Sequence, residues 1–234
     1  LADRVRDTET LLVQQSRINT ELQEGLMKTR MIPFASMVPR LRRIVRQISG
    51  ELGKKVDFDV RNAEGEMDRN ILERMIAPLE HMLRNALDHG IESPADRKQA
   101  GKPETGEVTL SLTREGGDVV LRMIDDGAGI PSSVIRDKAI RQGMLREDED
   151  LSEREILQFI LQPGFSTAQQ VTQISGRGVG MDVVASEIKQ LGGSLDIDSA
   201  VGRGTTFTVR LPFTVSVNRA LMVSTGEDFY AIPL

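Results

Sequence analysis

The sequence predicts an α+β fold in which helices cover one face of a mixed sheet. Strand-like segments follow one another in pairs across Gly116-Gly117 and across 202–204, which is typical of antiparallel hairpins. Helical patterns come in separate blocks and do not alternate strictly with the strands, which argues against a wholly parallel α/β sheet. We therefore expect a mixed, mostly antiparallel sheet.

Composition restricts the function classes that are open to this 234-residue chain. It contains no cysteine, which excludes disulfides, zinc–thiolate sites, iron–sulfur clusters and cysteine nucleophiles. The net charge of −5 argues against a dedicated nucleic-acid-binding protein. No segment approaches the ~20 apolar residues of a membrane helix, so no direct membrane insertion is expected. We also expect a piece of a longer protein, because the chain begins at Leu1 within a helical pattern.

The first element is a polar helix over residues 1 to about 32 with a narrow seam. The seam alternates at spacings of four and three residues through Leu11, Gln15, Ile18, Leu22, Gly25 and Thr29. Such a thin stripe favours a coiled-coil or bundle partner, although packing on the helix's own domain remains an alternative. Pro33 interrupts the pattern and Pro39 follows it, so a junction is expected near residues 31–39.

The following elements alternate between helical and strand periodicity. A helix is expected from Ser36 or Pro39 to Gly53, and a long helix from Asp68 to His89 with Gly90 as its C-cap. Short helices are expected near 132–142 and 152–162, a polar loop over 163–180, and a helix over 181–191. Strands are expected at 56–60, 108–112, 119–124, 194–199 and 205–211, and 214–234 indicates strands of a second, incomplete β module.

Polar side chains gather at the end of the long helix. His81, Asn85 and Asp88 are spaced i, i+4 and i+7, so they share one helical face. His89 follows directly, and the chain has no histidine outside this group. A structural or surface role is the ordinary interpretation of one histidine, but this grouping indicates a site.

A second cluster follows the strand at 119–124. Asp125 and Asp126 precede Gly127 and Gly129, and an ordinary turn is the competing interpretation. A carboxylate fixed at a strand end can accept a hydrogen bond from an exocyclic amine, and glycine allows a close approach of backbone to a ligand.

The third cluster is Gly176, Gly178 and Gly180, which open the helix at 181–191. Glycines at a helix N-terminus expose N–H groups that can bind phosphate. The polar loop before them is long enough to act as a lid. Neither a dinucleotide fingerprint nor a P-loop is present, so glycine-rich turns alone remain a weak signal.

In this order, the three clusters resemble the GHKL ATP-binding fold of histidine kinases, gyrase, Hsp90 and MutL. Longer segments, at 27–33, 83–92, 163–167, 175–184 and 204–205, are similar to the CheA family of chemotaxis histidine kinases. The similarity covers essentially the whole chain. Residues 40–46 also resemble the large hybrid kinases of type IV pilus motility.

The resemblance implies a Bergerat (GHKL) α/β sandwich, with a long helix before it and a truncated SH3-like β module after it. Residues 1–33 would be the second helix of a dimerisation hairpin. Residues 34–213 would form the ATP-binding catalytic kinase domain. Residues 214–234 would begin a CheW-like regulatory domain.

The resemblance also implies ATP and Mg²⁺ as cofactors and assigns roles to individual residues. Asn85 would ligate Mg²⁺, and Asp125 would accept a hydrogen bond from the adenine amino group. The remaining candidates for nucleotide binding are Arg84, Asp88, His89, Gly127, Gly129, Lys138, Phe165, Ser166, Thr167, Gly176, Arg177, Gly178, Gly180 and Thr205.

His81 stands where ATP-hydrolysing members of the fold carry a glutamate base. We assign it as general base for phosphoryl transfer onto a substrate histidine, with hydrogen bonding to the γ-phosphate as the competing role. No histidine of this chain fits an H-box. The resemblance therefore places the substrate histidine on a phosphotransfer domain of the same protein, outside this chain, from which phosphate passes to CheY-like response regulators.

Further expectations from the resemblance are a homodimer through the helical hairpin, and CheW-like coupling protein and chemoreceptors as partners. The location would be the bacterial cytoplasm, beside membrane receptor arrays. Two rival functions remain: an ATPase or clamp of the gyrase, MutL or Hsp90 type, and a non-catalytic nucleotide-binding scaffold.

Overall fold

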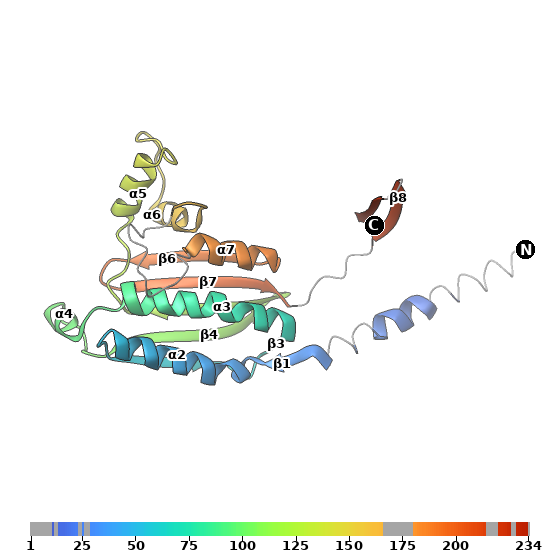
Figure 1. Ribbon diagram of the computed structural model, residues 1–234, viewed down its shortest axis with the longest axis horizontal. Helices are drawn as coiled ribbons and strands as arrows, with labels where there is room; N and C mark the ends of the chain where they lie inside the picture. Colours follow the sequence, from blue (N-terminus) through green and yellow to red (C-terminus); the bar gives the residue numbers. More distant parts are fainter. Residues whose placement is uncertain are drawn as a thin grey trace, which may run out of the picture.

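The computed structural model describes residues 11, 14–22, 25, 29–165, 180–213, 220–225 and 228–233 (Figure 1). Its centre is a five-stranded sheet in the order β2-β4-β5-β7-β6. These strands span Val56–Arg61, Gly106–Glu115, Asp118–Asp125, Gly204–Pro212 and Ser194–Ala200 respectively. β2 runs parallel to β4, and the other three pairs are antiparallel. The predicted mixed, mostly antiparallel sheet is confirmed.

Three helices pack on one face of this sheet: α2 (Val38–Glu51), α3 (Arg69–Asn85) and α7 (Met181–Gln190). Alternate residues of β4, including Val108, Leu110 and Leu112, are buried beneath them. Alternation of this kind is the burial pattern of a sheet with one covered face, so the prediction of helices on one side is confirmed.

The end of α3 differs from the prediction. The helix ends at Asn85, and a π-helical turn, η2 (Ala86–Gly90), continues the chain. The N–H of Ile91 donates to the carbonyl of Ala86 at 2.7 Å, which closes this wider turn. The prediction of Gly90 as the C-cap is wrong, because Gly90 is the last residue of this turn, Ile91 is its C-cap, and Gly90 is not among the residues with positive φ.

The N-terminal pattern also ends earlier than expected. Residues 14–22 are helical, but Met31–Pro33 form strand β1, which pairs with β3 (Glu66–Asp68). Asp68 then caps α3 by accepting from the N–H groups of Asn70 and Ile71, and Arg30 pairs with the same carboxylate at 3.2 Å. The sequence pattern did not predict β1, β3 or the short helix α4 (Pro94–Gln99), because each is too short to show a period.

The remaining described elements confirm their predictions. They are α5 (Ser132–Arg141), α6 (Glu153–Leu157), the 3₁₀ turn η3 (Gln158–Leu161), and a two-stranded sheet of β8 (Ala220–Thr225) and β9 (Asp228–Pro233). The apolar seam residues Leu11, Ile18 and Leu22 are exposed. Within the described residues, no helix combines the length and the apolar character needed to span a membrane.

Candidate functional site

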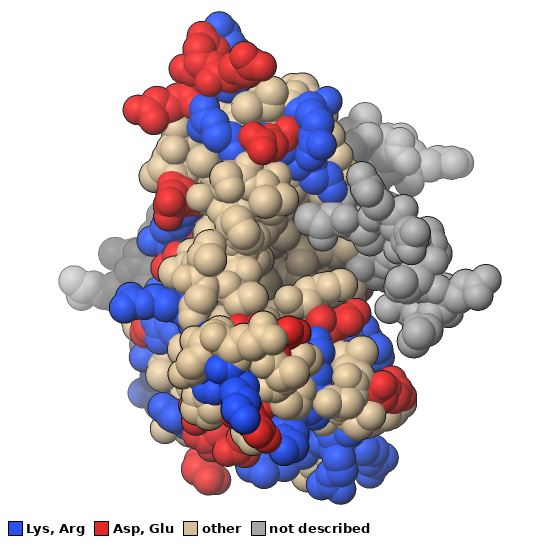
Figure 2. Space-filling model, turned by 90° about the vertical axis from the view of Figure 1, so that its left-hand side faces the viewer, with Lys and Arg blue, Asp and Glu red and all other residues tan. Residues whose placement is uncertain are grey.

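Several of the described site residues lie together at one end of the molecule, where α3 ends, α7 begins and β5 ends. Asn85 Nδ2 lies 3.0 Å from Met181 Sδ, which joins the two helix ends. Gly90, at the end of η2, lies against the Asp125 carboxylate. Figure 2 looks onto this end of the molecule and shows a hollow surfaced mostly by uncharged residues. Asn85 and Asp125 are therefore neighbours of a single short segment, the π-helical turn.

The Asp125 side chain is buried, with 3% of its surface exposed. Its Oδ1 accepts hydrogen bonds from the N–H of Gly127 at 3.0 Å and of Thr205 at 3.3 Å. Among the described residues, none donates a hydrogen bond to Oδ2. Burial raises the pKa of Asp125 to about 6, the two N–H donors oppose the rise, and nearby Asp126 adds to it. The arrangement leaves one carboxylate oxygen as an acceptor for a ligand.

The glycines around Asp125 allow backbone segments to pack closely on one another. A Cβ at Gly127 would lie 2.2 Å from the Gly90 carbonyl oxygen, and one at Gly204 would lie 1.9 Å from the Asp125 carbonyl oxygen. Gly129 has φ +72°, and its Cβ would lie 2.2 Å from the carbonyl oxygen of Ala200. A side chain at any of these three positions would collide with backbone, so glycine is required there for close packing of the chain on itself.

His81 and Asn85 lie on the face of α3 that meets α7, as their spacing predicted. Both side chains are half-buried. Burial lowers the pKa of His81, Arg84 lowers it further, and Asp182 opposes the shift. The imidazole is therefore mainly neutral at pH 7 and can accept a proton or a hydrogen bond.

Asp88 and His89 lie beyond the end of α3, where the i+7 relation no longer holds because the turn is π-helical. Their side chains are exposed, and His89 Nε2 lies 3.6 Å from Asp88 Oδ2. Lys54 Nζ donates to the carbonyls of Leu87 and Asp88 at 2.7 Å each, and burial lowers its pKa. This lysine, which the sequence analysis did not select, therefore holds the π-helical turn.

Lys138 and Phe165, two further predicted site residues, contact each other. The Lys138 ammonium lies 5.1 Å from the centre of the Phe165 ring, a cation–π distance. Phe165 itself has no exposed surface and packs on Phe159. Burial lowers the pKa of Lys138, and Arg141 contributes to the same shift. The Lys138 ammonium therefore lies over the face of the buried Phe165 ring.

Only part of the predicted lid can be placed. Ser166, Thr167, Gly176, Arg177 and Gly178 lie outside the described residues. At the start of α7, Gly180 is the N-cap residue, and no described side chain caps this helix. Just before the undescribed stretch, the N–H of Gly164 donates to Asp182 Oδ2 at 3.2 Å, so both borders of the loop meet at the start of α7.

The comparison with known families agrees with this geometry. Residues 74–215 match the family described as histidine kinase-, DNA gyrase B-, and HSP90-like ATPase, which is more than half of the chain. The chain belongs to this ATPase family. The matched segment contains the Asn85, Asp125 and Gly180 regions.

Relatives that resemble nearly the whole chain narrow the assignment. The sensor histidine kinase CheAY of Helicobacter pylori is 44% identical over 221 residues, covering 94% of this chain and 28% of that protein. The chemotaxis protein CheA of Bacillus subtilis is 41% identical over 229 residues, covering 97% of this chain and 34% of that protein. The chemotaxis protein CheA of Klebsiella aerogenes is 42% identical over 221 residues, covering 94% of this chain and 34% of that protein. The predicted resemblance to the CheA family is confirmed, and the chain spans about a third of these relatives.

Among solved structures, the histidine kinase domain from the Erythrobacter litoralis EL346 blue-light activated histidine kinase is similar at 19% identity. The match covers 78% of this chain and 62% of that chain, with a TM-score of 0.45.

The donor set fits a magnesium ion held mainly by a ligand's phosphates. No group of three or more histidine or acidic side chains that could enclose a metal exists among the described residues. Mg²⁺ commonly takes few protein ligands and completes its shell with phosphate oxygens and water. The Asn85 amide nitrogen contacts Met181, so the Asn85 carbonyl oxygen is the atom that would ligate such an ion.

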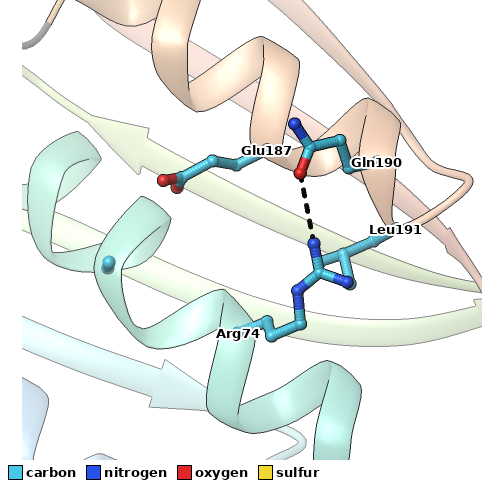
Figure 3. Close-up of a pocket in the computed structure, with 5 residues that line it drawn as sticks. Arg74, Glu187, Gln190 and Leu191 are labelled. Atoms are coloured by element: carbon cyan, nitrogen blue, oxygen red, sulfur yellow. Dashed lines mark hydrogen bonds between the residues drawn. The ribbon is translucent and has the colours of Figure 1, made fainter.

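A separate small pocket of about 200 Å³ lies between α3 and α7, away from the predicted site (Figure 3). It is lined by Arg74, Ala77, Glu187, Gln190 and Leu191, and Arg74 Nη2 donates to Gln190 Oε1 at 3.4 Å. None of the predicted site residues lines it, and it is smaller than typical ligand pockets. We assign no role in the ATPase family's chemistry to this pocket.

Proposed function

We propose that this chain is the catalytic core of a chemotaxis-type histidine kinase that binds Mg²⁺-ATP between Asp125 and the start of α7. The observation that best supports this proposal is the Asp125 carboxylate, which is buried and already accepts two hydrogen bonds at Oδ1. An exocyclic amine that donates to Oδ2 would complete the hydrogen bonding of this carboxylate. Membership in an ATPase family makes the adenine amino group the natural donor.

The phosphates would lie on the other side of η2, near Asn85 and the N-terminus of α7. A helix start without a side-chain cap offers N–H groups and the positive end of its dipole. Arg84, Lys138 and His89 are the cationic or hydrogen-bonding candidates around it, with Gly180 at the border of the lid. Asn85 would hold Mg²⁺, which neutralises charge on the phosphates.

Phosphoryl transfer would run to a histidine outside this chain. Both histidines of the sequence belong to the site cluster, so neither is a candidate substrate. The neutral His81 would accept a proton or hold the γ-phosphate while a substrate histidine attacks. The resemblance to the CheA family adds response regulators, a coupling protein, receptors and pairing through the N-terminal helix to this proposal.

ATP hydrolysis by a clamp-type ATPase is the second candidate. In place of a glutamate base the chain has His81, with Glu80 beside it. Glu80 Oε1 accepts from Arg40 Nε at 2.6 Å, on the side of α3 that faces α2. Glu80 is therefore engaged away from the proposed phosphate site, which favours transfer over hydrolysis.

The test is a calorimetric titration with ATP in the presence of Mg²⁺, comparing the natural chain with Asp125→Asn. We expect the natural chain to bind and the variant to lose affinity by about 100-fold, because a hydrogen bond to a charged acceptor is replaced by a poorly matched amide. Asp118→Asn, at the far end of the same strand, should bind like the natural chain. Equal affinity of the natural chain and Asp125→Asn would refute the assignment.

A further inference from the structure

Behind the proposed purine site, on the side of Asp126, lies a fully buried arginine that the sequence analysis did not select. Arg97 has no exposed surface. Its Nη1 and Nη2 donate to the two Asp126 carboxylate oxygens at 3.1 and 2.7 Å, and Nη1 also donates to Glu92 at 3.1 Å. Its Nε donates to the carbonyl of Pro103 at 2.6 Å, and Nη2 donates also to the carbonyl of Thr105 at 3.4 Å. The guanidinium thus ties α4 and the start of β4 to the end of β5.

Lys102 completes this cluster with three short hydrogen bonds. Its Nζ donates to Glu92 Oε1 at 2.7 Å, to the carbonyl of Asp126 at 2.9 Å and to the carbonyl of Gly127 at 2.7 Å. An ammonium group has three donors, and all three are used. Arg97 Nη1 also donates to the Asp126 carbonyl, at 3.3 Å.

These carbonyl contacts act on the Asp125 carboxylate through planar peptide groups. The peptide between Asp126 and Gly127 has its carbonyl on Lys102 and its N–H on Asp125 Oδ1 at 3.0 Å. The next peptide has its carbonyl on Lys102 and its N–H, from Ala128, on the Gly90 carbonyl at 2.9 Å. Because a peptide is planar, holding its carbonyl fixes the direction of its N–H.

We propose that Lys102 and Arg97 are positioning residues for purine selection. By holding the 126–127 peptide, they keep its N–H on Asp125 Oδ1 and reserve Oδ2 for the exocyclic amine of the base. The inference rests on the proposed function, because it concerns the same nucleotide site. The inference extends the proposed function, because it names residues that would not touch the nucleotide and yet would determine which base is bound.

A purely structural role for this cluster is the competing explanation. Buried ion pairs are weak evidence for stability, and removal of one partner leaves the other charge uncompensated. A structural role would weaken the binding of all nucleotides alike. A positioning role would weaken ATP selectively, because only ATP offers the amine that Asp125 accepts.

The experiment compares ATP with purine riboside triphosphate, which lacks the 6-amino group, in Mg²⁺-containing titrations of the full chain. In the natural chain, ATP should bind about tenfold more tightly, the value of a hydrogen bond to a charged group. Lys102→Met should bring this ratio to within about twofold by weakening ATP alone. Lys55→Met removes an exposed lysine paired with Glu104 and should leave the ratio unchanged.

Three outcomes would overturn the inference. If Lys102→Met weakens both nucleotides equally, or keeps the natural preference, the cluster does not select the base, while the proposed function stands. If the natural chain binds neither nucleotide, the proposed function fails and this inference fails with it. Should Lys102→Met not fold, Arg97→Lys retains a buried cation without the planar two-donor fork and should show the same loss of preference.

Discussion

The two sides of the proposed site differ in how completely the chain holds its own side chains. At the purine side, Asp125 is buried, and its neighbouring peptides are bonded at both ends. At the phosphate side, His81 and Asn85 are half-buried, and the described partner of the Asn85 side chain is a methionine sulfur. The purine side is thus pre-organised. On the phosphate side, a bound ligand would have to supply the remaining contacts of the His81 and Asn85 side chains. We infer that recognition and transfer are separable by mutation.

The largest effect should come from His81→Gln. Glutamine retains hydrogen-bonding capacity but cannot take up a proton, so transfer to an added histidine-phosphotransfer domain should fall at least about 100-fold. ATP affinity should change less than about threefold, because the purine side is untouched. Transfer rate and affinity would be measured by labelled phosphate and calorimetry.

Equal losses in transfer rate and ATP affinity would refute the assignment of His81 as general base and the separation of recognition from transfer.

Acid-labile phosphate on the chain alone, before any phosphotransfer domain is added, would show that the substrate histidine lies within this chain. Arg40→Ala, which breaks the Arg40–Glu80 pair on the other side of α3, is the matched control and should leave transfer within about twofold.

A smaller effect should follow from pH. Because the pKa of Asp125 is raised to about 6, roughly a tenth of these groups are ionised at pH 5. ATP affinity should therefore fall about tenfold between pH 7.5 and 5 beyond the change seen with purine riboside triphosphate, whose phosphates titrate in the same way. Identical pH profiles for the two nucleotides would place the titrating group elsewhere.

The smallest effect concerns the stability of the ligand-free chain. The folded-state pKa of Asp125 lies above its unfolded value of about 3.9, so its contribution to stability is present below that value and is lost as pH rises through about 6. Asp125→Asn removes the buried charge and should raise Tm at pH 7.5 by a few degrees, roughly 2–4 °C per kcal/mol for a chain of this size. The difference in Tm between the variant and the natural chain should vanish near pH 4, and scanning calorimetry at pH 7.5 and pH 4 measures it.

A lower Tm of Asp125→Asn at pH 7.5 would instead show that the carboxylate stabilises the fold.

Much of the fold and part of the site followed from sequence pattern. Hairpin glycines and periodic helices located the five-stranded sheet and its covering helices, because these features are local. The face shared by His81 and Asn85 also followed from helical spacing. The π-helical turn did not, since nothing in residues 86–90 distinguishes it from an α-helical end.

The supporting cluster could not be predicted because it depends on tertiary contacts. Arg97 and Lys102 lie in a polar segment whose composition is typical of an exposed surface. Arg97 is nevertheless among the most buried side chains of the described chain. Their acceptors include Glu92, the carbonyls of Pro103 and Thr105, and a turn that lies 24 to 29 residues further along the chain. Asp126 beside Asp125 was the one visible signal, since a second carboxylate at a buried strand end needs a cation.

The π-helical turn sets a fixed spacing between the two halves of the site. Asn85 stands immediately before it and Gly90, against Asp125, ends it, so five residues and one ammonium, that of Lys54, define the separation. At about 1.5 Å of rise per residue or less, this spacer is no longer than about 8 Å along its axis. If the proposed site is right, this turn would select ligands by length: a molecule whose amine and metal-binding oxygens are spaced differently would not reach both halves of the site.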